Sequence, residues 1–443
     1  MLTTAGLALV LLLLQYAPSL SGLFAWAGCY RAVPVTLALL LLLALMHAQG
    51  LVAARNRVAS QRVVLALVLG LWCASTLWSY LYGATNALGW PVGALVACFA
   101  MVLLAAALVR VRLAPPWVLL VCVFLFFTAA CISVIAACPF DSVFREGRPL
   151  WNIRNAAHRL QQGDWIYAYG DGNTPAYPPL GVFVYLPAGL LGWDLRYVSV
   201  GLVVAALFVM CWRRSLPDAC LLALSPAFLY GAVTTQVPFY WLCLALFVVA
   251  LQEGHVSRQR IWLLAAIATR PLALPLLAGW VAHRLVQPGS AVSFRRIAAF
   301  RPQLAELVLI GFTAVCFAMD PRSFLWNTLK LPQSDGLRAV ASGVPQPCGQ
   351  LALTPLLPFA LKPTAVLGFQ LLALTAALFV LIRQRWLHRY AVQSLIALYT
   401  VFLCFNFVMY NYYWLDVVVM SVASFGAAAR VRSGLLSDPK RTQ

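Results

Sequence analysis

The chain has 443 residues, of which 63% are hydrophobic and 10% are charged, whereas an ordinary soluble domain carries about 25% charged residues. This composition excludes a soluble globular protein, a disordered chain and a nucleic-acid-binding module, in spite of a net charge of +19. Several runs of about 18 to 25 residues are almost free of charge, as transmembrane helices require. We therefore predict an all-α, polytopic integral membrane protein.

The expected organisation is a single membrane domain. Five N-terminal transmembrane helices over 1–137 precede an extracytoplasmic loop at 138–178, and 179–443 holds the remaining helices with a second outer loop at 320–350. In chain order, apolar spans are predicted near 3–27, 33–50, 62–83, 88–109, 117–137, 179–193, 196–212, 219–235, 237–252, 261–283 (broken), 304–319, 351–361, 364–382, 390–409 and 412–429.

The arginines predict the orientation, because positive residues mark the cytoplasmic side of a membrane. Most of them cluster between spans at 55–62, 110–112, 213–214, 258–260, 284–301, 383–389 and 430–441, and all these clusters can be cytoplasmic. This orientation requires an odd number of crossings between Pro178 and Arg213, where two apolar pieces occur. One interpretation is that 179–193, which is short for a span, does not cross the membrane but lies in the interface or dips in and back. The other is that Arg213 and Arg214 depart from the positive-inside rule. We favour the interpretation in which 179–193 does not cross.

The first outer loop holds four of the twelve acidic residues, Asp141, Glu146, Asp164 and Asp171. A bare connector between two spans needs only a few residues, so a loop this long is expected to be folded and functional. Within it, 151–162 is predicted to form an amphipathic helix lying flat on the membrane surface; the alternative is a solvated capping helix without chemistry.

Asp141 follows the fifth predicted span by a few residues, which places its carboxylate at the level of the lipid headgroups. One interpretation is a general base that takes a proton from an acceptor hydroxyl. The other is a helix-end residue that pairs with Arg145 one turn further on.

Arg270 and Pro271 interrupt an apolar segment. An arginine inside a membrane usually faces a polar cavity or a partner, and the proline breaks the helix. Arg270 is thus either a cation at a re-entrant tip that binds a lipid-linked phosphate, or a loop end that meets lipid phosphate or water. Gln236 lies at a second break between apolar segments. It either lines the polar cavity expected around Arg270 or belongs to a plain turn.

Asp416 lies within the last predicted span, where a carboxylate marks a functional or paired site. We expect it to pair with Arg270 or Lys362 rather than to act in catalysis. The neighbouring aromatic residues, Tyr410, Tyr412, Tyr413 and Trp414, are typical of an interfacial belt.

Most of the twelve cysteines are interpreted as small residues buried in the membrane. Cys138 and Cys348 are predicted to lie outside it on one side, where a disulfide between them is possible. The loop at 320–350 is a candidate lid over the site.

A family resemblance rests on four segments. GRPLWNIRNAAHRLQQGDWIYA at 147–168 and Tyr177-Pro178-Pro179-Leu180 resemble the first outer loop of GT-C glycosyltransferases and the segment after it, most closely in the mannosyltransferase-like glycosyltransferase family 87. SPAFLYGAVTTQVPFYW at 225–241 resembles the family's N-P-A…G-Q segment. IWLLAAIATRPLALPLLAGWVAHR at 261–284 resembles its helix–Lys-Pro–helix segment, with Arg270 in place of lysine. The resemblance spans about 138–300.

The sequence departs from this pattern in two ways. The aspartate of the family's G-x-D-F motif would fall near Pro149, so Asp141 is assigned as the base by its position after the helix. Four additional helices also precede the acidic loop, and we interpret them as an accessory module.

The resemblance implies a GT-C-like transmembrane bundle whose outer loop carries short interfacial helices, and an enzyme. It would transfer a sugar, with mannose as the candidate, from a polyprenyl-phosphate donor to a lipid or glycan acceptor at the outer face, with inversion. Asp141 would be the catalytic base and Arg270 would hold the phosphate. The other residues of the expected substrate site are Arg145, Arg148, Tyr177, Gln236 and Asp416.

No metal or separate cofactor is expected, because arginine can supply the positive charge. The expected partners are the donor, the acceptor and the lipids of a bacterial inner or plasma membrane, and no nucleic acid. Two alternatives remain. A lipid-linked oligosaccharide polymerase or ligase fits the long outer loop but leaves Tyr-Pro-Pro-Leu unexplained. A flippase or transporter often shows internal repeats, and none is apparent here.

Overall fold

A computed structural model of the chain describes residues 116–137, 148–169, 175–212, 216–285, 303–330, 363–406 and 411–425. Every regular element in these ranges is helical. They are α5 (Pro116–Ala137), α7 (Arg148–Gln161), α8 (Pro179–Phe183), α9 (Leu186–Leu190), α10 (Leu195–Trp212), α11 (Leu216–Leu224), α12 (Pro226–Thr234), α13 (Pro238–Glu253), α14 (Val256–Thr269), the 3-10 helix η3 (Pro271–Ala273), α15 (Leu274–Leu285), α17 (Leu304–Met319), α18 (Pro321–Leu325), the π-helix η4 (Trp326–Lys330), α20 (Pro363–Arg383), α21 (Trp386–Arg389), α22 (Ala391–Cys404) and α23 (Asn411–Phe425).

Two of the described helices, α5 and α20, are long and apolar enough to cross a membrane. A third candidate is α17 together with Pro321–Thr328, which comprises α18 and the start of η4; the two parts are bent by 111°. The predicted spans at 117–137, 196–212, 237–252, 304–319 and 364–382 agree with α5, α10, α13, α17 and α20 to within one residue at each end. The predictions on 1–115 and 351–361, and the Cys138–Cys348 pair, lie outside the described residues.

Two predicted spans are divided in the structure. The span at 219–235 consists of α11 and α12, because Pro226 starts a new helix and cannot continue the preceding one. The piece at 179–193 consists of the short helices α8 and α9. Both have only five residues, so this piece contains no continuous helix long enough to span a bilayer.

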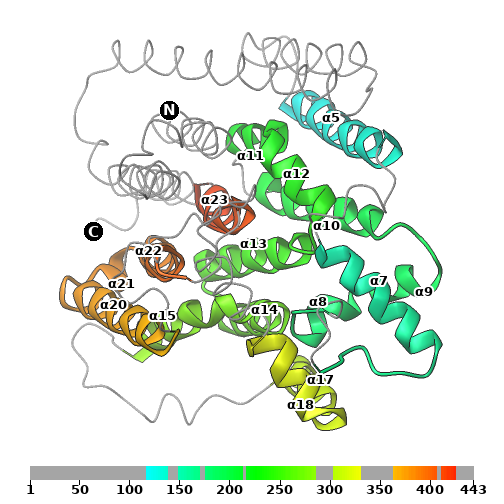
Figure 1. Cartoon of the computed structure of the whole chain (residues 1–443). Helices are drawn as coiled ribbons and strands as arrows, with labels where there is room; N and C mark the ends of the chain where they lie inside the picture. The colour runs from blue at the N-terminus through cyan, green and yellow to red at the C-terminus, as the bar shows by residue number, and fades with distance from the viewer. Residues whose placement is uncertain are drawn as a thin grey trace, which may run out of the picture.

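Helix α13 forms the middle of the bundle. Figure 1 shows it between α10 and α12 on one side and α14 on the other, and it also packs on α23. The Trp241 ring stacks on Phe228 of α12, with 4.8 Å between ring centroids. Gly231 makes this contact possible, since a Cβ there would lie 2.8 Å from the Trp241 ring.

Helix α7 carries the amphipathic pattern predicted for 151–162, but its apolar side packs on protein. Leu150, Ile153, Ala156 and Ala157 are buried in a cluster shared with α8 and α9. A Cβ on Gly189 of α9 would lie only 2.9 Å from that of Ala157. The apolar side of this helix is therefore covered by α8 and α9, whereas the predicted position of the helix flat on a membrane surface stays a prediction.

Helix α17 is fixed at both ends. At its start, Glu306 forms a capping box with Gln303 and an ion pair with Arg260 of α14, at 2.7 Å. At its far end Asp320 accepts a hydrogen bond from the Ser323 backbone N–H, at 2.9 Å, and so begins α18. Beyond the bend, Asn327 donates to the Ala168 carbonyl at 3.0 Å, which joins η4 to the segment that follows α7.

Candidate functional site

The apolar segment around Arg270 is broken as the sequence predicts. Helix α14 ends at Thr269, Arg270 is extended (φ −151°, ψ 123°), and Pro271 begins the 3-10 helix η3. The Arg270 side chain is only 3% exposed. Its guanidinium carbon lies 5.7 Å from the centre of the Tyr240 ring, a cation–π distance. The break thus holds a buried positive charge within the bundle.

Asp416 is completely buried and accepts two hydrogen bonds. They come from Nε1 of Trp241 at 2.7 Å and from the hydroxyl of Tyr399 at 2.9 Å. The hydroxyls of Tyr399 and Tyr240 lie 3.1 Å apart, and the charge of Arg270 acts electrostatically on the carboxylate. We call Arg270, Tyr240, Trp241, Tyr399 and Asp416 the buried polar network; it joins α14, α13, α22 and α23.

The network refines the sequence prediction for Asp416. Arg270 is near enough to act electrostatically on the carboxylate, but an ion pair between them stays a prediction, and Lys362 lies outside the described residues. The two hydrogen-bond donors, Trp241 and Tyr399, were not predicted, and only their position opposite the acid in the fold identifies them. Trp414 is fully buried in the core, so its assignment to an interfacial belt is wrong.

Gln236 lies in the break between α12 and α13 and is 1% exposed. Neither its amide nitrogen nor its amide oxygen hydrogen-bonds to a described residue. It precedes Tyr240 by about one helical turn, at the same end of α13 as the buried polar network. A buried amide with both a donor and an acceptor to offer is suited to bind a hydroxyl.

The Tyr177-Pro178-Pro179-Leu180 element lies against the break at Arg270, between α14 and η3. The Tyr177 carbonyl accepts a hydrogen bond of 2.6 Å from the Tyr167 hydroxyl. The prolines lead into α8, which packs on α14. A Cβ on Gly181 would lie 3.0 Å from the carbonyl oxygen of Thr269, the residue before Arg270. Two motifs that are far apart in the sequence are therefore neighbours in space.

The other predicted site residues are not placed against the network. Asp141 and Arg145 lie outside the described residues, and Arg148 is the first residue of α7, where its side chain is not described. Among the described residues, no group of three or more His, Cys, Asp or Glu side chains has the arrangement of a metal site.

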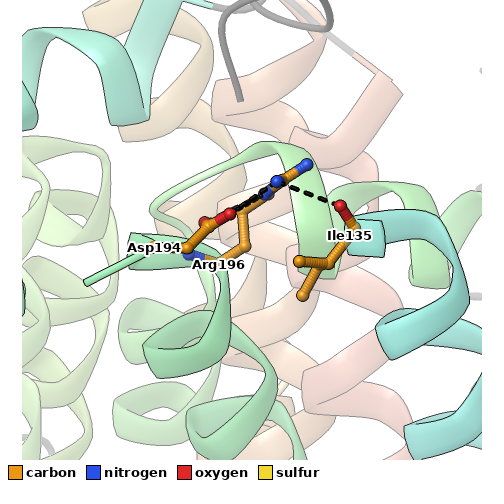
Figure 2. A network of polar contacts seen from close by, with 3 residues as sticks. All are labelled: Ile135, Asp194 and Arg196. Carbon is orange, nitrogen blue, oxygen red and sulfur yellow. Dashed lines mark hydrogen bonds and ion pairs between the residues drawn. The ribbon is translucent and has the colours of Figure 1, made fainter. Parts of the chain in front are cut away.

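A second buried charge, which the sequence prediction missed, lies at the start of α10 (Figure 2). Arg196 is 2% exposed. Its Nε lies 2.9 Å from both carboxylate oxygens of Asp194, and its Nη2 donates to the Ile135 carbonyl of α5 at 3.3 Å. An Asp-x-Arg sequence at the edge of an apolar span was the available signal.

Comparison with known proteins gives no relative: no family model, no curated protein and no solved structure matches this chain. The resemblance to GT-C glycosyltransferases therefore rests on the four segments quoted above.

Proposed function

We propose that the protein is a polytopic membrane glycosyltransferase of the GT-C type. It transfers a sugar, with mannose as the candidate, from a polyprenyl-phosphate donor to a lipid or glycan acceptor at the outer face of a bacterial inner or plasma membrane. The observation that carries this proposal is the packing of α8, which begins within Tyr177-Pro178-Pro179-Leu180 at Pro179, on Thr269 beside Arg270.

Arg270 has the properties that a phosphate leaving group needs. A guanidinium binds phosphate through two parallel N–H groups, and it stabilises negative charge most strongly where water is excluded. The Tyr240 ring lies beside the guanidinium of Arg270, at a cation–π distance of 5.7 Å. The apolar helices around it suit the polyprenyl chain, which is itself hydrocarbon.

The proposed reaction is a single displacement. Asp141 takes the proton of the acceptor hydroxyl while that oxygen forms a bond to the anomeric carbon of the sugar. The bond from this carbon to the phosphate oxygen breaks, and the phosphate leaves with the electron pair, beside Arg270. Attack from the face opposite the leaving group inverts the anomeric carbon. Arg145 or Arg148 assists with the phosphate, and Gln236 binds a sugar hydroxyl.

The proposal is tested with purified protein in lipid, radiolabelled polyprenyl-phosphate mannose and a membrane extract as the source of acceptor. We expect the wild type to transfer label, and Asp141→Asn and Arg270→Gln each to lower the rate about 10²-fold or more. Arg258→Gln is the matched control, because Arg258 is an exposed arginine at the other end of α14.

The outcomes separate the parts of the proposal. If Asp141→Asn transfers label at the wild-type rate, the base is another acid of the loop. If the wild type transfers no label, other polyprenyl-phosphate sugars are supplied. Failure with all of them, together with movement of the lipid-linked sugar across a proteoliposome membrane, would show a transporter instead.

A further inference from the structure

Helix α20 ends where the surface of the membrane is expected. It is long and apolar enough to cross a membrane, and its candidate span is Thr364–Arg383. Near the end of this span, Phe379 and Val380 are 60% and 49% exposed, as side chains that face lipid should be. Arg383 follows them by four and three residues, so it lies on the same face of the helix. This face therefore passes from apolar side chains to a cation within one turn.

Two more arginines follow Arg383 closely in the chain. Arg385 and Arg389 are exposed, as Arg383 is, and the Arg389 backbone N–H donates to the Arg385 carbonyl at 3.2 Å. Trp386 and Tyr390 lie among the arginines and are 37% and 39% exposed. Such rings are typical of the level of the lipid headgroups. We call these five residues the basic patch.

Packing holds the basic patch in place. Figure 1 shows α21 beside α20 and α22, and α21 contacts both of these helices and α15. Leu387 of α21 is buried, and its carbonyl oxygen lies 2.8 Å from Nδ1 of His283 on α15. The arginines are thus presented on a packed edge of the bundle.

The elements around the basic patch carry no negative side chain. The sequences of α15, α20, α21 and α22 contain no Asp or Glu, and α15 adds a further cation near its end, Arg284. Among the residues that the structure describes, no carboxylate forms an ion pair with an arginine of the patch. A negative partner from outside these helices would therefore be attracted to it.

The backbone at Arg385 supports a role for its side chain. Its φ of 57° lies in the left-handed region, and no other non-glycine residue of the described ranges has a positive φ. Glycine is favoured at such a position after a helix, because it has no Cβ to clash. An arginine in this conformation carries a conformational cost, which a binding role would offset.

We infer that the basic patch is a binding site for the phosphate headgroup of an anionic phospholipid, whose acyl chains lie along the exposed apolar face of α20. Arginine binds phosphate through two parallel N–H groups. The positive-inside rule places this end of α20 on the cytoplasmic side, where anionic lipids attract basic clusters. A soluble anion would use the arginines but not the apolar face beside them. The inference does not depend on sugar transfer.

The test measures lipid binding by the full chain, delipidated in mild detergent and followed by native mass spectrometry. The probes are phosphatidylglycerol and phosphatidylcholine with identical acyl chains. We expect the wild type to bind phosphatidylglycerol about ten-fold more tightly, and Arg383→Gln to weaken this binding about five-fold. Arg258→Gln is the matched control, because it removes the same charge at an exposed arginine of α14; it should bind like the wild type.

Arg385→Gly separates the charge from the backbone conformation. Glycine adopts a positive φ freely, so the lipid-free variant should melt at or above the temperature of the wild type. Its affinity for phosphatidylglycerol should nevertheless fall about five-fold. This variant also decides the question if Arg383→Gln fails to fold.

Two further probes distinguish a lipid from a free anion. Inorganic phosphate and glycerophosphoglycerol, the headgroup without acyl chains, should not raise the melting temperature at the concentration at which phosphatidylglycerol does. An equal rise with either would assign the patch to a soluble phosphate and overturn the inference. Equal affinity of the wild type for the two lipids, or unchanged phosphatidylglycerol binding in both arginine variants, would also overturn it, because the arginines would then serve only to orient the chain in the membrane.

Discussion

The indole Nε1 of Trp241 donates a 2.7 Å hydrogen bond to the carboxylate of Asp416, and this contact joins α13 to α23 inside the bundle. Tyr399 of α22 supplies the second donor to the same carboxylate. A carboxylate can be buried only where donors and positive charge replace the water it has lost. The network that includes Arg270 therefore stabilises the fold as well as the proposed phosphate site.

Replacing Asp416 by leucine should destabilise the protein, because Trp241 and Tyr399 would keep buried donors without their acceptor. We expect a loss of about 1–3 kcal/mol in the free energy of unfolding, measured by denaturant titration in mixed micelles. Tyr399→Phe removes one donor and should lose about 0.6 kcal/mol. Tyr197→Phe, at an exposed tyrosine, is the control. A stability for Asp416→Leu equal to that of the control would contradict this account of the network.

Gly181→Ala should impair transfer without a comparable loss of stability. Its Cβ would lie 3.0 Å from the Thr269 carbonyl, so α8 must move away from α14 by a few tenths of an ångström, directly beside Arg270. We expect kcat/KM to fall about ten-fold in the radiolabel assay. Gly201→Ala, where a Cβ meets no atom within 4 Å, should behave like the wild type, and equal activity of the two variants would refute the link between α8 and the site.

Gly279 permits the close approach of α15 and α22. A Cβ there would lie 2.5 Å from Leu395 and 2.9 Å from Leu398, both buried side chains. Gly279→Ala should therefore lower stability by about 1–3 kcal/mol, seen as a lower melting temperature. Gly368→Ala on α20 meets no atom within 4 Å and should be neutral or stabilising, because alanine favours helix. A reversed order of the two melting temperatures would show that this packing is wrong.

We expect His388 to make stability depend on pH. It lies in α21, between α20 and α22, near His283, with 5.6 Å between the ring centroids. Burial lowers the pKa of His388, so protonation is harder in the folded than in the unfolded chain. The contribution of His388 to stability is complete above its unfolded pKa of about 6.5 and is lost as the pH falls below that value.

We therefore expect the melting temperature of the wild type to fall between about pH 7 and about pH 5 more than that of His388→Gln. Differential scanning fluorimetry at matched ionic strength measures both. Parallel curves for the two proteins would show that another group causes the acid sensitivity.

Much of the helical organisation could be predicted from the sequence, because long apolar runs and prolines are local signals. The ends of α5, α10, α13, α17 and α20 follow from the first signal, and the break at Arg270 follows from the second. Pro226 carried the same signal for α11 and α12, but the apolar run at 219–235 outweighed it in the prediction.

The inward-facing contacts could not be predicted in the same way. A side chain that faces lipid and one that faces the protein interior are both apolar, so Trp414 gave no local sign that it is buried. Trp241 and Asp416 are brought together only by the packing of α13 on α23. The amphipathic pattern of α7 was visible, but the sequence does not tell whether lipid or α9 covers its apolar side.

The contacts of α17 also bear on how the bundle can move. Glu306 and Arg260 hold one end. Further along, the ring of Phe312 packs edge-on against Phe183 of α8, with 4.9 Å between centroids. Tilting α17 would break two contacts: the largely buried ion pair of Glu306 with Arg260 at its start, and the ring contact of Phe312 with Phe183 further along the helix. For the proposed lipid-linked donor, we therefore expect any lateral entry to occur away from α17, which stays fixed between α14 and α8.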